Sequence, residues 1–164
     1  MAINPNNALD AKHVCYLAGT GGGKTAAVKL LKFHGNHVGI FDMYGDYIYD
    51  GRKKNNPFNG LGGREVFHYK TRSGFANAFA QAWRSGKRFA VAYQPEFKSS
   101  LQGKALKDAK QAELYWFGQL MWAAADGNRE LHVIIEELAK LANTSGKDDT
   151  IIGELATGGR KFGV

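Results

Sequence analysis

The sequence has little cysteine and no long apolar run. Cys15 is the only cysteine among 164 residues, which excludes an intrachain disulfide and a cysteine metal cluster. The most apolar segment, residues 114–125, is too short to span a bilayer and contains Gln119. The polar N-terminus lacks the apolar core of a signal peptide, and no internal repeat is visible. We therefore expect a soluble, intracellular protein with a single domain, residues 1–164, that is long enough to bury a sizeable core.

Acidic residues are scarce in the middle of the chain. Residues 48–110 contain 13 Lys or Arg and 4 Asp or Glu, whereas the remainder contains 9 and 11, for a net charge of +7. A basic segment beside a nearly neutral remainder favours a polyanionic partner. A solvated basic face that serves solubility alone is the alternative.

Glycine is abundant, and it is concentrated in the stretch AGTGGGKT, residues 18–25. An apolar run over residues 13–18 predicts a strand before it, and the apolar spacing over residues 24–34 predicts a helix after it. Strand, glycine loop and helix in this order are typical of a phosphate-binding loop, in which backbone N–H groups and the helix N-terminus face phosphate oxygens. A glycine-rich surface turn is the alternative.

The loop departs from the usual phosphate-binding pattern at one position, because Ala18 stands where that pattern has its first glycine. The other residues of the loop have expected roles in binding a nucleotide. We expect Lys24 to reach the β- and γ-phosphates and the Thr25 hydroxyl to hold Mg²⁺. The residues expected to bind ATP here are Gly19, Thr20, Gly21, Gly22, Gly23, Lys24 and Thr25.

Strand and helix patterns alternate along the rest of the chain. Strands are predicted over residues 37–44, 64–69, 88–95 and 131–135, and helices over residues 74–85, 107–125 and 148–159. This alternation predicts an α/β fold with a mostly parallel sheet covered by helices on both faces. The wide apolar surface of residues 107–125 predicts a helix buried on most sides, and we expect Trp83, Trp116 and Trp122 to pack in the core.

Two adjacent acids end the last predicted strand. In such sheets ligands bind at the carboxyl ends of the strands, so Glu136 and Glu137 are expected at the edge of the phosphate site. We predict that Glu136 supports Mg²⁺ and that Glu137 orients or deprotonates the attacking water. A helix start with acids in its first turn is the alternative.

Asp42 ends the second predicted strand and is followed by Gly45, Asp46 and Tyr47. This pattern resembles the HerA branch of the FtsK/HerA superfamily of DNA-translocating ATPases, and the segment GGRKFG, residues 158–163, is similar to their arginine-bearing segment. Short members with adjacent acids at this place resemble the genome-packaging ATPases of tailless, membrane-containing viruses. The resemblance extends over residues 13–163.

The resemblance implies a P-loop NTPase of the RecA/ASCE type that uses ATP and Mg²⁺ to move double-stranded DNA. It adds Asp42 to the nucleotide-binding residues and makes Arg160 a catalytic arginine finger. It also implies a homo-oligomeric, hexameric ring, portal or membrane-vertex partners, and a place in the host cytoplasm or the virion. Members continue into a further strand with a polar sensor residue, so we expect the chain to be a fragment that ends before it.

Other functions share the glycine loop. A nucleotide kinase would need a closing lid, for which residues 51–63 are the candidate. A GTPase switch is poorly supported, because residues 145–149, SGKDD, only half match the guanine-reading element. The paired glutamates favour hydrolysis over transfer. For DNA phosphates the candidate contacts are residues 52–54 and the group Arg84, Lys87 and Arg88.

Overall fold

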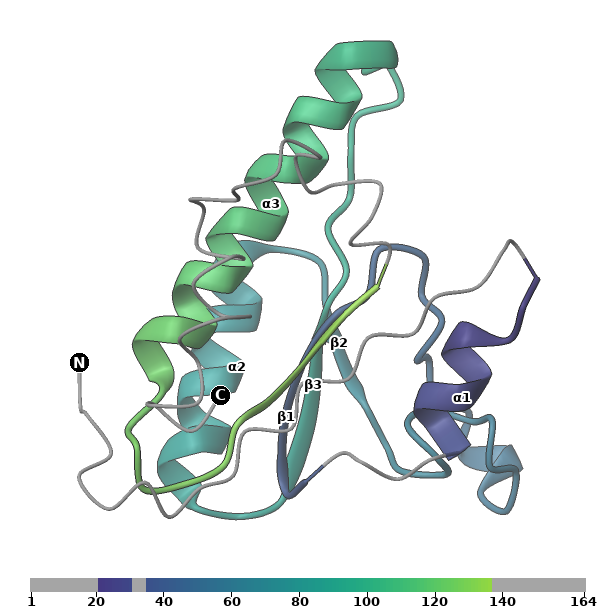
Figure 1. The fold of residues 1–164 in the computed structure, drawn as a ribbon, viewed down its shortest axis with the longest axis vertical. Coiled ribbons are helices and arrows are strands. Elements are labelled where there is room, and N and C mark those ends of the chain that lie inside the picture. The colour runs from purple at the N-terminus through teal and green to yellow at the C-terminus, as the bar shows by residue number, and fades with distance from the viewer. Residues whose placement is uncertain (1–20, 31–34, 137–164) are drawn as a thin grey trace.

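The computed structural model describes residues 21–30 and 35–136, which form a parallel α/β fold (Figure 1). Its elements are α1 (Lys24–Leu30), β1 (His37–Phe41), the 3-10 helix η1 (Gly51–Lys53), β2 (Phe67–Tyr69), α2 (Arg72–Ser85), β3 (Phe89–Tyr93), α3 (Gly103–Ala124) and β4 (His132–Ile135). The four strands form one parallel sheet in the order β2-β3-β1-β4. The predicted parallel sheet is confirmed.

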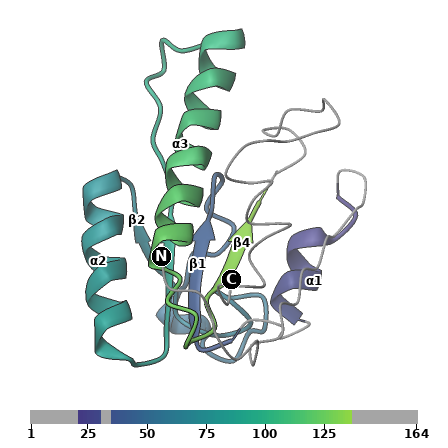
Figure 2. The ribbon, with the colours of Figure 1, turned by 60° about the vertical axis from the view of Figure 1, so that its left-hand side comes forward.

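Helices lie on both sides of this sheet, as the sequence predicts (Figure 2). Alternate residues of β1 face opposite ways, so Phe41 packs with α2 and α3 while Val38 and Ile40 pack on the side of α1. Gly39 allows α3 to approach closely, since a Cβ there would lie 2.5 Å from the sulfur of Met121. The α2–α3 side holds the larger core: Phe41, Met43, Phe75, Phe79, Trp83, Phe89, Val91, Tyr93, Leu114, Phe117, Met121 and Leu131.

Two predicted strands are shorter than the apolar pattern suggests. β1 ends at Phe41 because Asp42 begins a turn in which Gly45 has a φ of +77°. β2 begins at Phe67 rather than at residue 64, because Leu61 and Arg64 close a tight turn through two glycines with positive φ. The predicted strand over residues 13–18 and helix over residues 148–159 lie outside the described residues.

The long helix α3 is amphipathic, so the prediction that it is buried on most sides is wrong. Its buried residues are Leu114, Phe117, Gly118 and Met121, all in its second half. Its first turns project beyond the sheet (Figure 1) and are largely exposed. The helix also begins at Gly103, four residues before the predicted start, because its first residues include the good helix formers Lys104, Ala105 and Leu106.

The three tryptophans pack against the core as predicted. Trp83 is 9% exposed, and Trp116 and Trp122 are partly buried against the α2–α3 side of the sheet. The described helices include none with the length and hydropathy that a membrane span requires.

Candidate functional site

Two predicted site residues lie side by side at the carboxyl edge of the sheet. Asp42 follows β1 and Glu136 follows β4, and these strands pair in parallel with Phe41 beside Ile135. The backbone N–H of Glu136 donates to the carbonyl of Phe41 at 3.3 Å, which continues the ladder past the end of β4. The edge expected from the sequence is therefore formed.

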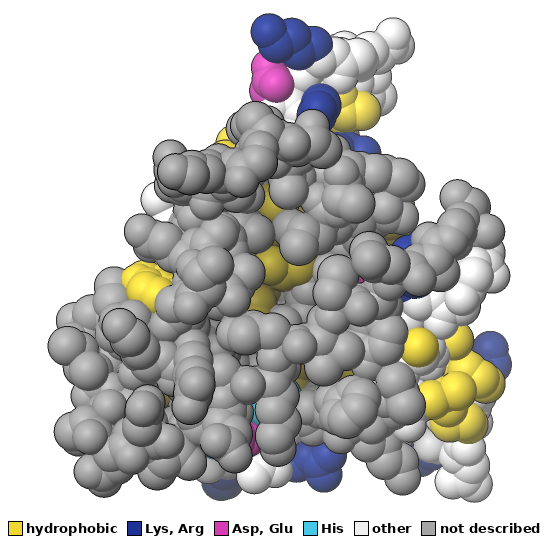
Figure 3. All heavy atoms as spheres, viewed as in Figure 1, with side chains coloured by type: hydrophobic (Ala, Val, Ile, Leu, Met, Phe, Trp, Pro, Cys, Tyr) yellow, Lys and Arg dark blue, Asp and Glu magenta, His cyan; other side chains and the backbone are white. Residues whose placement is uncertain are grey.

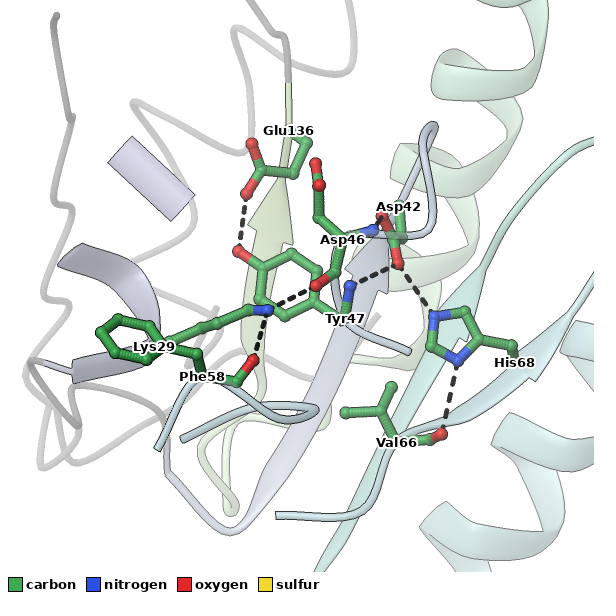
Figure 4. Close-up of polar contacts among 8 residues, drawn as sticks. All are labelled: Lys29, Asp42, Asp46, Tyr47, Phe58, Val66, His68 and Glu136. Carbon is green, nitrogen blue, oxygen red and sulfur yellow. Dashed lines mark hydrogen bonds and ion pairs between the residues drawn. The ribbon is translucent and has the colours of Figure 1, made fainter. Parts of the chain in front are cut away.

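Glu136 connects this edge to α1. Its carboxylate accepts a hydrogen bond at 2.6 Å from the Tyr47 hydroxyl (Figure 4). The side chain of Thr25, the second residue of α1, lies near enough to the same carboxylate to lower its pKa. Burial raises the pKa of Glu136, and the charges of Asp46 and Asp42 act in the same direction, whereas the side chains of Tyr47 and Thr25 lower it. The two side chains predicted to hold Mg²⁺, Thr25 and Glu136, thus lie close to one another.

Tyr47 is presented to Glu136 by a turn that Asp42 organises. The Asp42 carboxylate is fully buried and accepts hydrogen bonds from the N–H groups of Asp46 at 2.8 Å and Tyr47 at 3.0 Å. Nε2 of His68, which lies on β2, is 2.8 Å from the same carboxylate (Figure 4). Burial opposes ionisation, but these hydrogen bonds hold the pKa of Asp42 below its ordinary value. Burial and the contact with Glu136 raise the pKa of the Tyr47 hydroxyl, which therefore remains a donor.

Lys29 is a buried cation of the site that the sequence analysis missed. It is 8% exposed, and its ammonium donates to the backbone carbonyls of Asp46 and Phe58 and lies 5.2 Å from the centre of the Tyr47 ring (Figure 4). Burial lowers its pKa, although nearby carboxylates act against this. Its position four residues after Thr25, on the same face of α1, is the sequence signal that identifies it.

The described part of the glycine loop has the backbone that its composition predicts. Gly21 and Gly23 have φ values of +77° and +76°, a region that other residues rarely adopt. A Cβ at either position would meet no atom of the described residues within 4 Å, so the backbone conformation, not crowding by these residues, requires glycine. Gly22 is exposed and Lys24 is half-buried at the start of α1. Four predicted site residues lie outside the described residues: Gly19, Thr20, Glu137 and Arg160.

The donor set suits a magnesium ion that a substrate helps to hold. No group of three or more His, Cys, Asp or Glu in residues 21–30 and 35–136 is arranged to hold a metal by itself. Mg²⁺ usually takes one or two carboxylates and completes its shell with water and substrate phosphates. One carboxylate, Glu136, and one hydroxyl, Thr25, fit this requirement.

The two basic groups predicted to contact DNA are exposed. Residues 52–54 lie in η1 and directly after it, in the segment between β1 and β2. The Nζ atom of Lys53 lies 3.6 Å from Oδ2 of Asp50. Arg84, Lys87 and Arg88 surround the turn between α2 and β3, at the amino edge of the sheet and so opposite the site.

Comparison of the chain with protein-family models, curated proteins and solved structures found no match. The assignment of a function therefore rests on the side chains gathered at the carboxyl edge of the sheet.

Proposed function

We propose that the protein is a magnesium-dependent ATPase of the P-loop, RecA/ASCE-like class. The observation that carries the proposal is the proximity of Thr25, directly after the glycine loop and Lys24, to Glu136, directly after β4 at the carboxyl edge of the sheet. The sequence assigned both residues to one metal although they are 111 positions apart, and a structural surface turn would give no reason for them to lie close together. The positive φ of Gly21 and Gly23 supports the same assignment.

Each residue then has a definite task. The loop N–H groups and Lys24 bind the phosphates, and Thr25 and Glu136 bind Mg²⁺, which when present neutralises charge on the phosphate oxygens. The hydrogen bond from Tyr47 fixes the orientation of the Glu136 carboxylate. Asp42 acts through the turn that carries Tyr47, and Glu137 orients or deprotonates water.

Hydrolysis, we further propose, drives movement of double-stranded DNA by a homo-oligomeric ring, for which a hexamer is our expectation. The excess of cations in residues 48–110 and the resemblance of the motifs around Asp42 and Arg160 support this proposal. In such a ring Arg160 of one subunit stabilises charge on the nucleotide of its neighbour. Genome packaging in a virus, with portal or membrane-vertex partners, is the corresponding biological role.

A nucleotide kinase is less well supported. The end of the loop proposed as its lid is packed against the protein, since Leu61 is fully buried and Asn59 is 6% exposed, whereas residues 51–58 are exposed. The Asn59 side chain also accepts from the N–H of Asp50 at 2.7 Å and donates to the carbonyls of Asp50 and Lys53. A loop anchored at its end in this way is a poor candidate for a lid that closes as a whole over an acceptor substrate.

A double-mutant cycle tests the metal pair that carries the proposal. ATP affinity is measured with Mg²⁺ and with EDTA for the wild type, Thr25→Ala, Glu136→Gln and the double variant. We expect each single change to remove most of the gain in affinity that Mg²⁺ confers, and the double variant to lose little more, because both residues serve one ion. Additive losses, or wild-type ATP binding that is the same with and without Mg²⁺, would contradict the proposal.

The motor function needs its own measurement. The ATPase rate is followed with and without double-stranded DNA over a range of protein concentrations. Stimulation by DNA that increases as subunits assemble is expected of a ring motor, whereas a rate indifferent to both DNA and concentration contradicts it.

A further inference from the structure

The projecting end of α3 carries a group of lysines that the sequence analysis did not single out. Lys98, Lys104 and Lys107 are exposed, Lys110 is half-buried, and Asp108 is the one acid between residues 98 and 110. We name residues 98–110 the basic arm; cationic side chains gather where it projects (Figure 3). We propose that the basic arm is the surface by which this protein binds the phosphate backbone of double-stranded DNA. This inference rests on the proposed motor function.

The basic arm lies on the nucleotide side of the sheet. It follows β3, which ends at Tyr93, and parallel strands end at one edge, so the arm starts from the edge that holds Asp42 and Glu136. The group around Arg84 and Arg88 precedes β3 and lies at the opposite edge. Of these two basic groups, the arm is therefore the one placed to respond to nucleotide.

The charges of the basic arm are not neutralised within the described part of the chain. Lys53 and Lys70 lie near Asp50 and Glu96, but none of the three exposed arm lysines has an ion-pair partner among the described residues. The first turn of α3 also lacks an acid, and its N-cap residue Gln102 makes no side-chain capping hydrogen bond. Lysines at a helix N-terminus are unfavourable, because they repel one another and the positive end of the helix dipole. Binding of a polyanion would relieve this electrostatic repulsion.

The spacing of the lysines in α3 suits contacts with the phosphates of a DNA duplex. Lys104, Lys107 and Lys110 follow at steps of three, so they share one side of the helix and extend over about 9 Å at 1.5 Å per residue. A duplex carries one charge per about 1.7 Å of its axis, so neighbouring lysines meet separate phosphates without reading bases. A membrane surface would demand apolar side chains beside the lysines. The large exposed apolar residues of the described chain are Leu30, Tyr44, Ile48, Phe58 and Phe67. All lie outside residues 98–110, although the Tyr44 ring lies near Lys110.

The arm is also joined to the site. The ammonium of Lys110 lies 5.7 Å from the ring centre of Tyr44 and 6.0 Å from that of Phe97. Tyr44 belongs to the turn between Asp42 and Tyr47, whose hydroxyl holds Glu136. One side-chain contact thus separates the arm from the turn that orients the metal-binding carboxylate.

The test compares two triple variants of the full chain that remove the same charge. Lys98→Gln/Lys104→Gln/Lys107→Gln alters the arm, and Arg84→Gln/Lys87→Gln/Arg88→Gln alters the opposite edge. Affinity for a mixed-sequence duplex is measured by fluorescence anisotropy over a range of salt concentrations, with circular dichroism as the check on folding. Each phosphate contact contributes about 0.9 to the slope of log K against log[salt], so the arm variant should lose about 2.7. When the salt concentration rises fourfold, the affinity of the arm variant for DNA should therefore fall about 40-fold less than that of the wild type. The control variant should keep the wild-type slope.

A gain-of-charge variant keeps the proposal falsifiable if the triple variant folds poorly. Asp108→Lys, four residues after Lys104 on the same helix side, should steepen the slope by about 0.9. Equal losses in the two triple variants, no loss in the arm variant, or binding to vesicles of anionic lipid in place of DNA would overturn the proposal. Wild-type protein that binds DNA through the arm but no ATP would overturn the proposed function instead.

Discussion

Asp42→Asn tests whether the buried carboxylate organises the turn that carries Tyr47. The carboxylate is fully buried and serves three donors: Oδ1 accepts from the N–H of Asp46, and Oδ2 receives the Tyr47 N–H and His68 Nε2. Asparagine offers one acceptor oxygen, so in its better orientation it still turns an NH₂ group toward the N–H of Asp46. One unsatisfied buried donor costs about 1–3 kcal/mol, and the remaining bonds lose their charge assistance.

The free energy of unfolding should therefore fall by about 2–4 kcal/mol at pH 7, measured by urea unfolding. The matched control is Asp50→Asn, which alters a carboxylate that also accepts a backbone N–H in a turn but is 43% exposed. We expect that control to change stability by less than about 0.5 kcal/mol. An Asp42→Asn variant as stable as the control would refute the role given to Asp42.

The pH dependence of this variant has a defined sign. Because the pKa of Asp42 is lowered in the folded protein, its contribution to stability is present above its ordinary value and is lost as pH falls through the lowered one. The difference between wild type and Asp42→Asn should therefore narrow below about pH 4. A difference that widens with acidity would contradict the lowered pKa of Asp42.

Two further predictions concern the nucleotide site. Tyr47→Phe removes only the hydroxyl that holds Glu136, so Mg²⁺ titration of a complex with a non-hydrolysable ATP analogue should show affinity about 10–100-fold weaker. Tyr93→Phe, which loses an equivalent 2.6 Å bond to Glu113 on α3, should leave Mg²⁺ affinity unchanged, and equal effects of the two variants would deny Tyr47 its positioning role. Lys24→Ala and Arg160→Ala subunits should each be inactive alone but recover hydrolysis when mixed, since an arginine finger contributes about 10³–10⁵ in rate across a subunit boundary. Mixed oligomers that form without recovering activity would place Arg160 in its own subunit.

The sequence predicted what depends on local pattern and chain order. Apolar runs located β1, β3 and β4, and the rule for parallel sheets brought Asp42 and Glu136 to one edge. The contacts that join them were beyond the sequence, because Tyr47 and Glu136 are 89 positions apart and meet only after the Asp42 turn has formed. The exposed start of α3 was missed although it depends only on local sequence. It has no apolar stripe and is helical through the propensity of its own residues, so a search for buried faces passed over it.

The hydrogen bonds of Lys29 affect how α1 can move relative to the segment that contains η1. Its stem belongs to α1 and its ammonium holds the carbonyls of Asp46 and Phe58, which lie on both sides of the 3-10 helix η1. To separate α1 from this segment, a buried cation and two carbonyls must all lose their partners together, which is far costlier than breaking one surface contact. We therefore expect the helix that follows the glycine loop and the segment that follows β1 to move together. A displacement imposed on the loop by a bound molecule should then reach Phe58, a half-exposed aromatic ring at the surface.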